Sequence, residues 1–329
     1  EKLDASEFYS WLDEKVRWCI SIYKEKAGFD LEFPNLLQEY FKERLKKDKV
    51  KKARYILPKK TGKAYQEIIS DDLVKRRIIE EGLEIIAAYI SGKYYIGRTL
   101  EVVKNKEFRS RDLGRPFQNS KVSIPPKIAR ILVNLTGLKP GETLLDPFCG
   151  IGTILQEAVV LGVKVLGGDI DGRRVSETVK NLKWLSETYS LKMENLSNRI
   201  FKADARHLSR RLQTKVDGIA TEPILLPPLK RFPSEEEADD VLRKAGEIYE
   251  DALPEMAKVL KKGGRLVLVI PYLRTNRRRE KSFNLEEVFE ESRLAPYHPK
   301  NLQRLKYPLM ASRDRDQKVL RGIYVLEKL

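Results

Sequence analysis

The second half of the sequence alternates short apolar runs with longer amphipathic segments, and this alternation limits the possible folds more than any other feature. The apolar runs are typical of strands and fall at residues 143–145, 163–168, 199–202, 218–221 and 265–270. Segments with helical character are found at residues 127–135, 152–160, 173–189, 208–212 and 238–260. Strands that alternate with helices predict a mostly parallel, doubly wound α/β sheet of the Rossmann type. A closing hairpin expected at 301–329 brings the predicted sheet to seven strands.

The first hundred residues have a different pattern, so we expect a separate domain there. Helices are expected at 36–47 and 72–81, and strands at 52–57, 83–90 and 93–100. We therefore predict a small α+β domain at 1–98, a polar linker at 99–120 and the α/β domain at 121–329. The length of 329 residues also favours two domains over one. The chain begins with Glu1 rather than Met, which leaves open whether further residues precede it.

The most informative motif of the α/β domain is Leu-Leu-Asp-Pro-Phe-Cys-Gly-Ile-Gly-Thr at 144–153. A strand, a tight glycine-containing loop and a helix follow one another there, at the edge where folds of this kind bind ligands. The motif is not the GxGxxG of dinucleotide sites, because Asp-Pro-Phe replaces the first glycine. An acid at this position suits a ligand with an amino group or a positive charge. The candidate cofactor-binding residues of this loop are Asp146, Phe148, Gly150, Gly152 and Thr153.

Two further acids follow the next two strands. Asp169 ends the second strand, where one carboxylate can accept hydrogen bonds from both hydroxyls of a ribose. Asp204 follows the third strand and is expected to accept a hydrogen bond from an adenine amino group. Asp171 is expected to cap the helix that begins near residue 173. Acids at three successive strand ends predict S-adenosylmethionine as the cofactor. The predicted cofactor-binding residues at the second and third strands are Asp169, Ile170, Asp204 and Ala205.

The fourth strand ends in Thr221-Glu222-Pro223, which is the candidate catalytic segment. An acid followed by a proline is similar to the (Asp/Asn/Ser)-Pro-Pro-(aromatic) motif of amino-methyltransferases. The exocyclic amine of a base has a delocalised lone pair, so it has to be oriented toward the methyl donor. A carboxylate and a backbone carbonyl that accept its two N–H bonds hold the nitrogen in line and localise that lone pair. In this interpretation Glu222 supplies the carboxylate, and Pro223 or Ile224 supplies the carbonyl.

The charge of the chain favours a polyanionic partner. Lys and Arg number 64 against 48 Asp and Glu, for a net charge of +16. Basic residues crowd the stretches 42–54 and 274–281. Such surfaces bind phosphates, because each neutralised phosphate releases counterions. Cys19 and Cys149 fit no metal or disulfide pattern, and no apolar run has the length of a membrane span, so we expect no metal and no membrane contact. We also expect a monomer in the cytoplasm.

Four blocks of the sequence carry a resemblance to a known family. They are Arg-Ser-Arg-Asp-Leu-Gly-Arg-Pro at 109–116, Pro-Pro-Lys-Ile-Ala-Arg at 125–130, Asp-Pro-Phe-Cys-Gly-Ile-Gly-Thr at 146–153 and Gly-Asp-Ile-Asp at 168–171. From about Gly92 to Leu329, the chain resembles the THUMP-containing RNA methyltransferases, especially the archaeal tRNA guanosine N2-methyltransferases. The first two blocks are the specific ones. The resemblance implies a THUMP-like RNA-binding module at about 8–98 and structured RNA as the partner.

The catalytic segment departs from the pattern of this family. The family has Asp-Pro-Pro-Tyr where this chain has Glu222-Pro223-Ile224-Leu225, so the acid is longer and the aromatic residue is missing. Phe232 or Tyr272 is the alternative candidate for stacking on the target base. This departure leaves the target base open.

The sequence therefore predicts an S-adenosylmethionine-dependent methyltransferase that acts on an exocyclic amine of a base in tRNA or rRNA. Guanosine N2 in tRNA, cytidine N4 in rRNA and adenosine N6 all remain open. A DNA amino-methyltransferase would use the same motifs, and a non-enzymatic RNA-binding protein would keep the same Rossmann fold.

Overall fold

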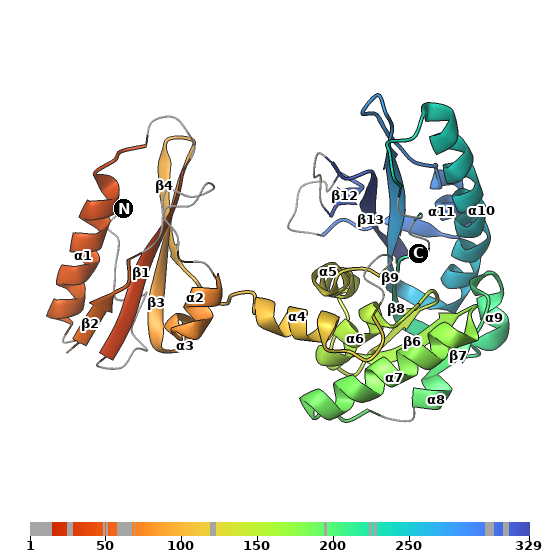
Figure 1. Cartoon of the computed structure of the whole chain (residues 1–329), viewed down its shortest axis with the longest axis horizontal. Helices are drawn as coiled ribbons and strands as arrows, with labels where there is room; N and C mark the ends of the chain where they lie inside the picture. Colours follow the sequence, from red (N-terminus) through yellow and green to blue (C-terminus); the bar gives the residue numbers. More distant parts are fainter. Residues whose placement is uncertain are drawn as a thin grey trace. The chain divides into compact units, whose positions relative to one another are not determined.

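The computed structural model describes residues 15–24, 29–48, 50, 52–57, 68, 70–118, 123–193, 196–223, 226, 229–299, 306–311 and 316–329. The chain divides into two compact units, Glu1–Glu107 and Phe108–Leu329 (Figure 1). In the described ranges, no helix combines the length and the apolar character that crossing a membrane requires.

The first unit is a four-stranded sheet with helices on both faces. Its strands are β1 (Lys15–Lys24), β2 (Lys52–Tyr55), β3 (Gly82–Ile90) and β4 (Lys93–Arg98). They lie in the order β2-β1-β3-β4, and only the β3–β4 pair is antiparallel. Helix α1 (Phe33–Lys47) packs on one face through Leu37, Phe41 and Leu45. Helices α2 (Ser70–Lys75) and α3 (Ile78–Glu81) cover Cys19 on the other face.

The second unit contains the predicted mostly parallel sheet, in the order β11-β13-β9-β8-β5-β6-β7. Its strands are β5 (Thr143–Asp146), β6 (Lys164–Asp169), β7 (Ile200–Lys202), β8 (Val216–Thr221), β9 (Leu260–Arg274), β11 (Leu294–Pro296) and β13 (Val319–Lys328). Along this path only β13 is antiparallel to its neighbours. Two short strands, β10 (Glu280–Lys281) and β12 (Leu309–Met310), pair with β9 and β13. The prediction of a mostly parallel, Rossmann-type sheet is therefore confirmed, with seven strands along the main path and nine in the whole sheet.

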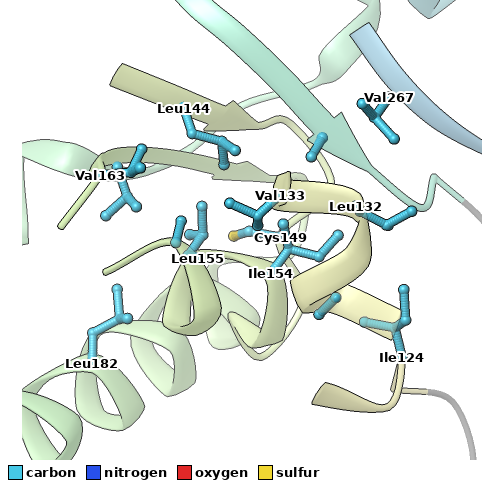
Figure 2. Close-up of a cluster of buried hydrophobic side chains, with 14 of the residues drawn as sticks. Ile124, Leu132, Val133, Leu144, Cys149, Ile154, Leu155, Val163, Leu182 and Val267 are labelled. Atoms are coloured by element: carbon cyan, nitrogen blue, oxygen red, sulfur yellow. The ribbon is translucent and has the colours of Figure 1, made fainter. Parts of the chain in front are cut away.

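Helices cover both faces of this sheet, each over its own apolar core. Helices α5 (Pro126–Thr136), α6 (Thr153–Val160) and α7 (Gly172–Tyr189) pack on one face. Figure 2 shows part of that core, with Leu132 and Val133 of α5 beside Ile154 and Leu155 of α6. Helices α9 (Leu208–Arg211), α10 (Glu235–Val259) and α11 (Glu286–Glu291) pack on the other face (Figure 1). The short helix α8 (Leu196–Arg199) leads into β7.

The helix predicted at 238–260 ends at Val259, within one residue of the prediction, but the strand after it begins earlier than predicted. That strand was expected at 265–270, whereas β9 begins at Leu260, so Gly263 and Gly264 lie inside β9. Gly263 has a φ of 75°, and a Cβ on Gly264 would lie 2.7 Å from the carbonyl oxygen of Asp217. Gly264 therefore allows β9 to approach β8 closely, at a point where the register of the two strands shifts.

The stretch 99–120, which we expected to be a polar linker, contains helix α4 (Asn105–Leu113). The second unit begins inside this helix, at Phe108. Arg111 and Arg115 of the same stretch are both buried, and they bind side chains of α6. Charged residues in the second half of this stretch therefore belong to a buried network of the second unit rather than to a solvated surface, whereas the domain bounds stay a prediction.

Candidate active site

The carboxyl ends of β5, β6 and β8 surround two cavities, at the point where the strand order reverses and where folds of this kind bind ligands. One cavity has a volume of about 160 Å³, with Asp146, Thr153 and Arg174 in its wall. The other has a volume of about 400 Å³, with Asp169, Asp204 and Pro223 in its wall. The two cavities share Phe148, Gly150 and Glu222 as wall residues, so they form one continuous candidate site.

The loop after β5 is held in place by the acid at the end of β6. Asp169 accepts a hydrogen bond from the backbone N–H of Gly150 at 2.9 Å, and its other oxygen accepts from the N–H of Asp171 at 2.9 Å. Gly150 and Gly152 have φ values of 53° and 85°, which favour glycine. A Cβ on Gly152 would also lie 2.8 Å from the Thr178 side chain. Asp169 thus shapes the loop and lines the larger cavity as well.

Asp146 is a buried carboxylate, 1% exposed, in the wall of the smaller cavity. It accepts hydrogen bonds from the backbone N–H of Phe148 at 3.1 Å and from the hydroxyl of Thr221 at 2.7 Å. Burial raises the pKa of Asp146 to about 7, against the effect of these two donors. Thr221 is fully buried, so the structure places it as a partner of Asp146 rather than as a residue that touches a substrate.

The predicted adenosine-binding residues line the larger cavity together. Ile170 is 62% exposed and offers an apolar surface to a planar ring, and Ala205 lies beside it in the wall. Asp204 is less available than we expected, because both of its oxygens accept hydrogen bonds from the Arg206 side chain, at 2.7 to 3.1 Å. Asp171 accepts from the N–H of Arg173, which confirms its predicted role as the cap of α7.

Cys149 belongs to the wall of the smaller cavity and packs in the apolar core beneath it. Figure 2 shows its sulfur close to Val133, Ile154 and Leu155. Burial raises the pKa of this thiol well above its ordinary value. A neutral, buried thiol is a poor nucleophile, so the geometry does not favour covalent catalysis by this residue.

Glu222 has a partner that the sequence analysis missed. Arg321 of β13 donates to it from Nε at 2.6 Å, and the Nη2 of Arg321 lies 3.5 Å from its second oxygen. The two side chains are only 7% and 12% exposed. Burial raises the pKa of Glu222, whereas Arg321 lowers it. One signal for this pair was present in the sequence, because Arg321 interrupts an otherwise apolar strand face with Ile323 and Val325.

The two aromatic residues that we considered for stacking have other contacts. The ring of Phe232 lies under the Arg278 guanidinium at 4.2 Å and near the Lys318 ammonium at 5.4 Å. Tyr272 shares a 2.8 Å hydrogen bond with Tyr324, and its ring occupies the side of β13 to which a Cβ on Gly322 would point. Because neighbouring residues of a strand point to opposite faces, Tyr272 lies across the sheet from Arg321. Ile224 and Leu225 lie outside the described residues.

Residues 114–295, more than half of the chain, match the family described as RMKL-like, methyltransferase domain. The chain belongs to this methyltransferase family. The match confirms the prediction of an S-adenosylmethionine-dependent methyltransferase, and with the relatives below it confirms the resemblance to archaeal tRNA methyltransferases. The THUMP-like nature of residues 1–98 stays a prediction.

Curated relatives of this methyltransferase include two archaeal proteins. The tRNA (guanine(10)-N2)-dimethyltransferase of Methanothermobacter thermautotrophicus is 34% identical over 207 residues, which are 62% of this chain and 56% of the relative. The enzyme of the same name from Pyrococcus abyssi is 31% identical over 193 residues, which are 57% of this chain and 50% of the relative. The chain thus spans about half the length of these relatives. The crystal structure of TrmN from Thermus thermophilus is 20% identical with a TM-score of 0.43, over 99% of this chain and 75% of that one.

Proposed function

We propose that this chain methylates the exocyclic amino group of a base in structured RNA, with guanosine N2 in tRNA as the first target to test. The observation that carries the proposal is the place of Glu222, a buried carboxylate in the shared wall of the two cavities. The archaeal relatives are named as tRNA guanine N2-dimethyltransferases, which supports this choice of base and RNA. The expected monomer and its cytoplasmic location stay predictions.

The donor set of the site fits S-adenosylmethionine. Asp169 would accept from the ribose hydroxyls and Asp204 from the adenine amine, with Ile170 against the adenine ring. The smaller cavity would hold the methionine end, because Asp146 suits an ammonium group and Thr153 offers a hydroxyl. When bound, this cofactor supplies an electrophilic methyl group. The loop residues Phe148, Gly150 and Gly152 would shape the part of the site that joins the adenosine end of the cofactor to its methionine end.

Glu222 would act on the target base from between the two parts of the cofactor site. Its carboxylate would accept one N–H of the target amine, and the backbone carbonyl of Pro223 would accept the other. Both acceptors hold the nitrogen in line with the methyl group and localise its lone pair. This role requires Glu222 to be ionised, since a protonated carboxyl group would present a donor to the amine.

The basic stretch after β9 is a candidate surface for RNA phosphates, with one correction. Arg274 is buried, and it donates to Glu280 at 2.8 Å, so it supports the β9–β10 hairpin instead of facing RNA. Arg277 and Arg279 are 72% and 68% exposed, beside a single carboxylate, Glu235. Together with Arg278, they form the cationic surface that would contact RNA phosphates.

The decisive experiment is a methyl-transfer assay on purified total tRNA, total rRNA and double-stranded DNA, with isotope-labelled S-adenosylmethionine. Nucleosides from each reaction are then separated and identified by mass. We expect labelled N2-methylguanosine or N2,N2-dimethylguanosine from tRNA. Labelled N4-methylcytidine from rRNA would move the target to a different base, and label in DNA alone would overturn the proposal. Heat-inactivated protein is the control for chemical methylation.

A further inference from the structure

We propose that Arg321 is a positioning residue, which holds the carboxylate of Glu222 ionised and turns one of its oxygens toward the target amine. This inference rests on the proposed function, because it assigns a partner to the group that would orient the amine. It concerns strand β13, which none of the sequence motifs pointed to.

The geometry places Arg321 behind Glu222, at the end of two strands that are distant in the sequence. Glu222 directly follows β8, and Arg321 lies 99 residues later on β13, opposite Pro271 of β9. Leu268 of β9 pairs with the last residue of β8, and β9 extends six residues beyond Leu268. Strand β13 pairs with this extension, so the side chain of Arg321 can reach past the end of β8 to Glu222. Ile323 and Val325, on the same face of β13 as Arg321, belong to the apolar core. Arg321 is therefore a cation on an apolar face, and Glu222 is the acid that it reaches.

The two oxygens of Glu222 are held differently. Oε1 accepts from Arg321 Nε at 2.6 Å, which is a short, charge-assisted hydrogen bond. Oε2 has only the 3.5 Å contact with Nη2 among the described residues, which is at the limit of a hydrogen bond. One oxygen is thus fixed by Arg321, and the other keeps its lone pairs for an N–H of the target amine. The extra methylene of Glu, compared with the Asp of the related motif, gives the side chain the length to do both.

The charges around Glu222 make its ionised state depend on Arg321. The charged side chains in the walls of the two cavities beside Glu222 are Asp146, Asp169, Arg174, Asp204 and Arg206. Arg206 is paired with Asp204, and Arg174 is paired with Glu177. The Glu222 carboxylate contributes to the raised pKa of Asp146, and burial disfavours the charged form of both groups. Arg321 is the cation in direct contact with Glu222, so its removal would leave a buried carboxylate that favours protonation.

The first test measures the protonation of Glu222 without any need for activity. Glu is labelled with ¹³C at its side-chain carboxyl, and the resonance of Glu222 is identified by its loss in Glu222→Gln. We expect the pKa of Glu222 to be higher in Arg321→Ala than in the native chain, and to return toward the native value in Arg321→Lys. An unchanged titration in Arg321→Ala would overturn the proposal.

The second test separates a positioning role from a structural one. Single-turnover methyl transfer to tRNA is measured against pH with saturating cofactor and RNA. For Arg321→Ala we expect unchanged S-adenosylmethionine affinity and a roughly 10²-fold lower rate at pH 7, the size of effect that one preorganised group has. The rate should recover in part as the pH rises, because Glu222 ionises again. A merely structural role would lower the rate equally at every pH.

Two further variants make the interpretation unambiguous. Lys328→Ala removes a cation from the far end of the same strand, where Lys328 binds the carbonyl of Ser292, and should leave rate and pH profile unchanged. In the Glu222→Gln background, Arg321→Ala should cause no further loss, because Arg321 acts through Glu222. Absence of methyl transfer to RNA by the native chain would contradict the proposed function. Native turnover in Glu222→Gln would contradict the role of Glu222 and this inference with it, whereas a slow Glu222→Gln beside a native-like Arg321→Ala would contradict only this inference.

Discussion

Glu157 of α6 accepts hydrogen bonds from Arg111 of α4, at 2.6 Å from Nε and 3.1 Å from Nη2. Arg130 of α5 donates to the same fully buried carboxylate at 2.9 Å. Arg111 and Arg130 come from the two sequence blocks that most specifically carry the family resemblance. Arg115, from the first block, donates to Thr153 at the start of α6 at 2.7 Å. The two blocks thus fix the helix that begins at the cofactor loop, which gives them a structural role in the site.

Replacement of Glu157 by Ala should make the second unit unfold more easily, because it leaves the buried guanidinium of Arg111 and the partly buried one of Arg130 without their carboxylate. Breaking a buried ion pair on one side costs about 3–5 kcal/mol of the free energy of unfolding. The control is Glu247→Ala, which removes an exposed ion pair with Arg243 on α10. Urea denaturation of Glu157→Ala and of Glu247→Ala would measure the free energy of unfolding that each variant loses. The control should lose less than about 1 kcal/mol. Equal losses in the two variants would contradict the network.

Binding of S-adenosylmethionine should strengthen as the pH rises through about 7, the pKa to which burial raises Asp146. Below that pH the carboxyl group is protonated and cannot attract the ammonium group of the cofactor. Above it the carboxylate is charged, so affinity should increase and then level off. Calorimetric titrations between pH 5.5 and 8.5 would measure the curve. Asp146→Asn should bind more weakly, and its affinity should vary less across this range.

Asp169→Ala should lower cofactor affinity by about one to two orders of magnitude, because charge-assisted hydrogen bonds contribute roughly 1.5–3 kcal/mol. The same change removes the acceptor for the N–H of Gly150, so part of the loss would come from a less ordered loop. Asp171→Ala is the matched control, two residues away. It removes the cap of α7, which costs about 1 kcal/mol of stability, and it should leave the affinity unchanged. Calorimetry that finds equal affinities for the two variants would refute the assignment of Asp169.

The sequence predicted those parts of the site that depend on local geometry or on the ends of parallel strands. Asp171 caps α7 through a bond to a residue two positions away, and Asp146 and Asp169 meet because parallel strands end at one edge. Arg321 was missed because its contact with Glu222 requires β13 to lie beside β9, which no local pattern reveals. The start of β9 was misplaced for a similar reason. Gly263 and Gly264 indicate a break in regular structure locally, but both lie inside β9, where Gly264 allows the close approach to β8.

The exposed arginines after β9 should contribute to RNA affinity through phosphates. In the variant with Arg277, Arg278 and Arg279 all replaced by Ala, we expect weaker binding and a flatter dependence on salt. Each lost phosphate contact lowers the slope of log affinity against log salt by roughly 0.7–0.9. Fluorescence anisotropy with labelled tRNA at several salt concentrations measures both quantities. As a control, Arg243 and Lys244 are replaced together, since both pair with Asp240 on their own helix. A native slope in the triple variant would remove this surface from the RNA-binding face.

Glu222→Gln should retain cofactor and RNA binding but lose most methyl transfer. The amide is nearly isosteric with the carboxylate, so the fold should persist. The amide nitrogen, however, is a donor, and it would face either the Arg321 guanidinium or the target amine. In both orientations the amine loses a charged acceptor, and the loss of one such preorganised group lowers the rate by roughly 10²–10³. Single-turnover assays with saturating cofactor and tRNA separate this step from binding.

Glu222→Asp is the informative companion variant. The shorter acid has the length found in the related motif, but its carboxylate lies farther from Arg321. If the distance to Arg321 matters, Glu222→Asp will be slower than the native chain and faster than Glu222→Gln. Near-native turnover in Glu222→Gln would show that the amine is oriented by groups other than this carboxylate.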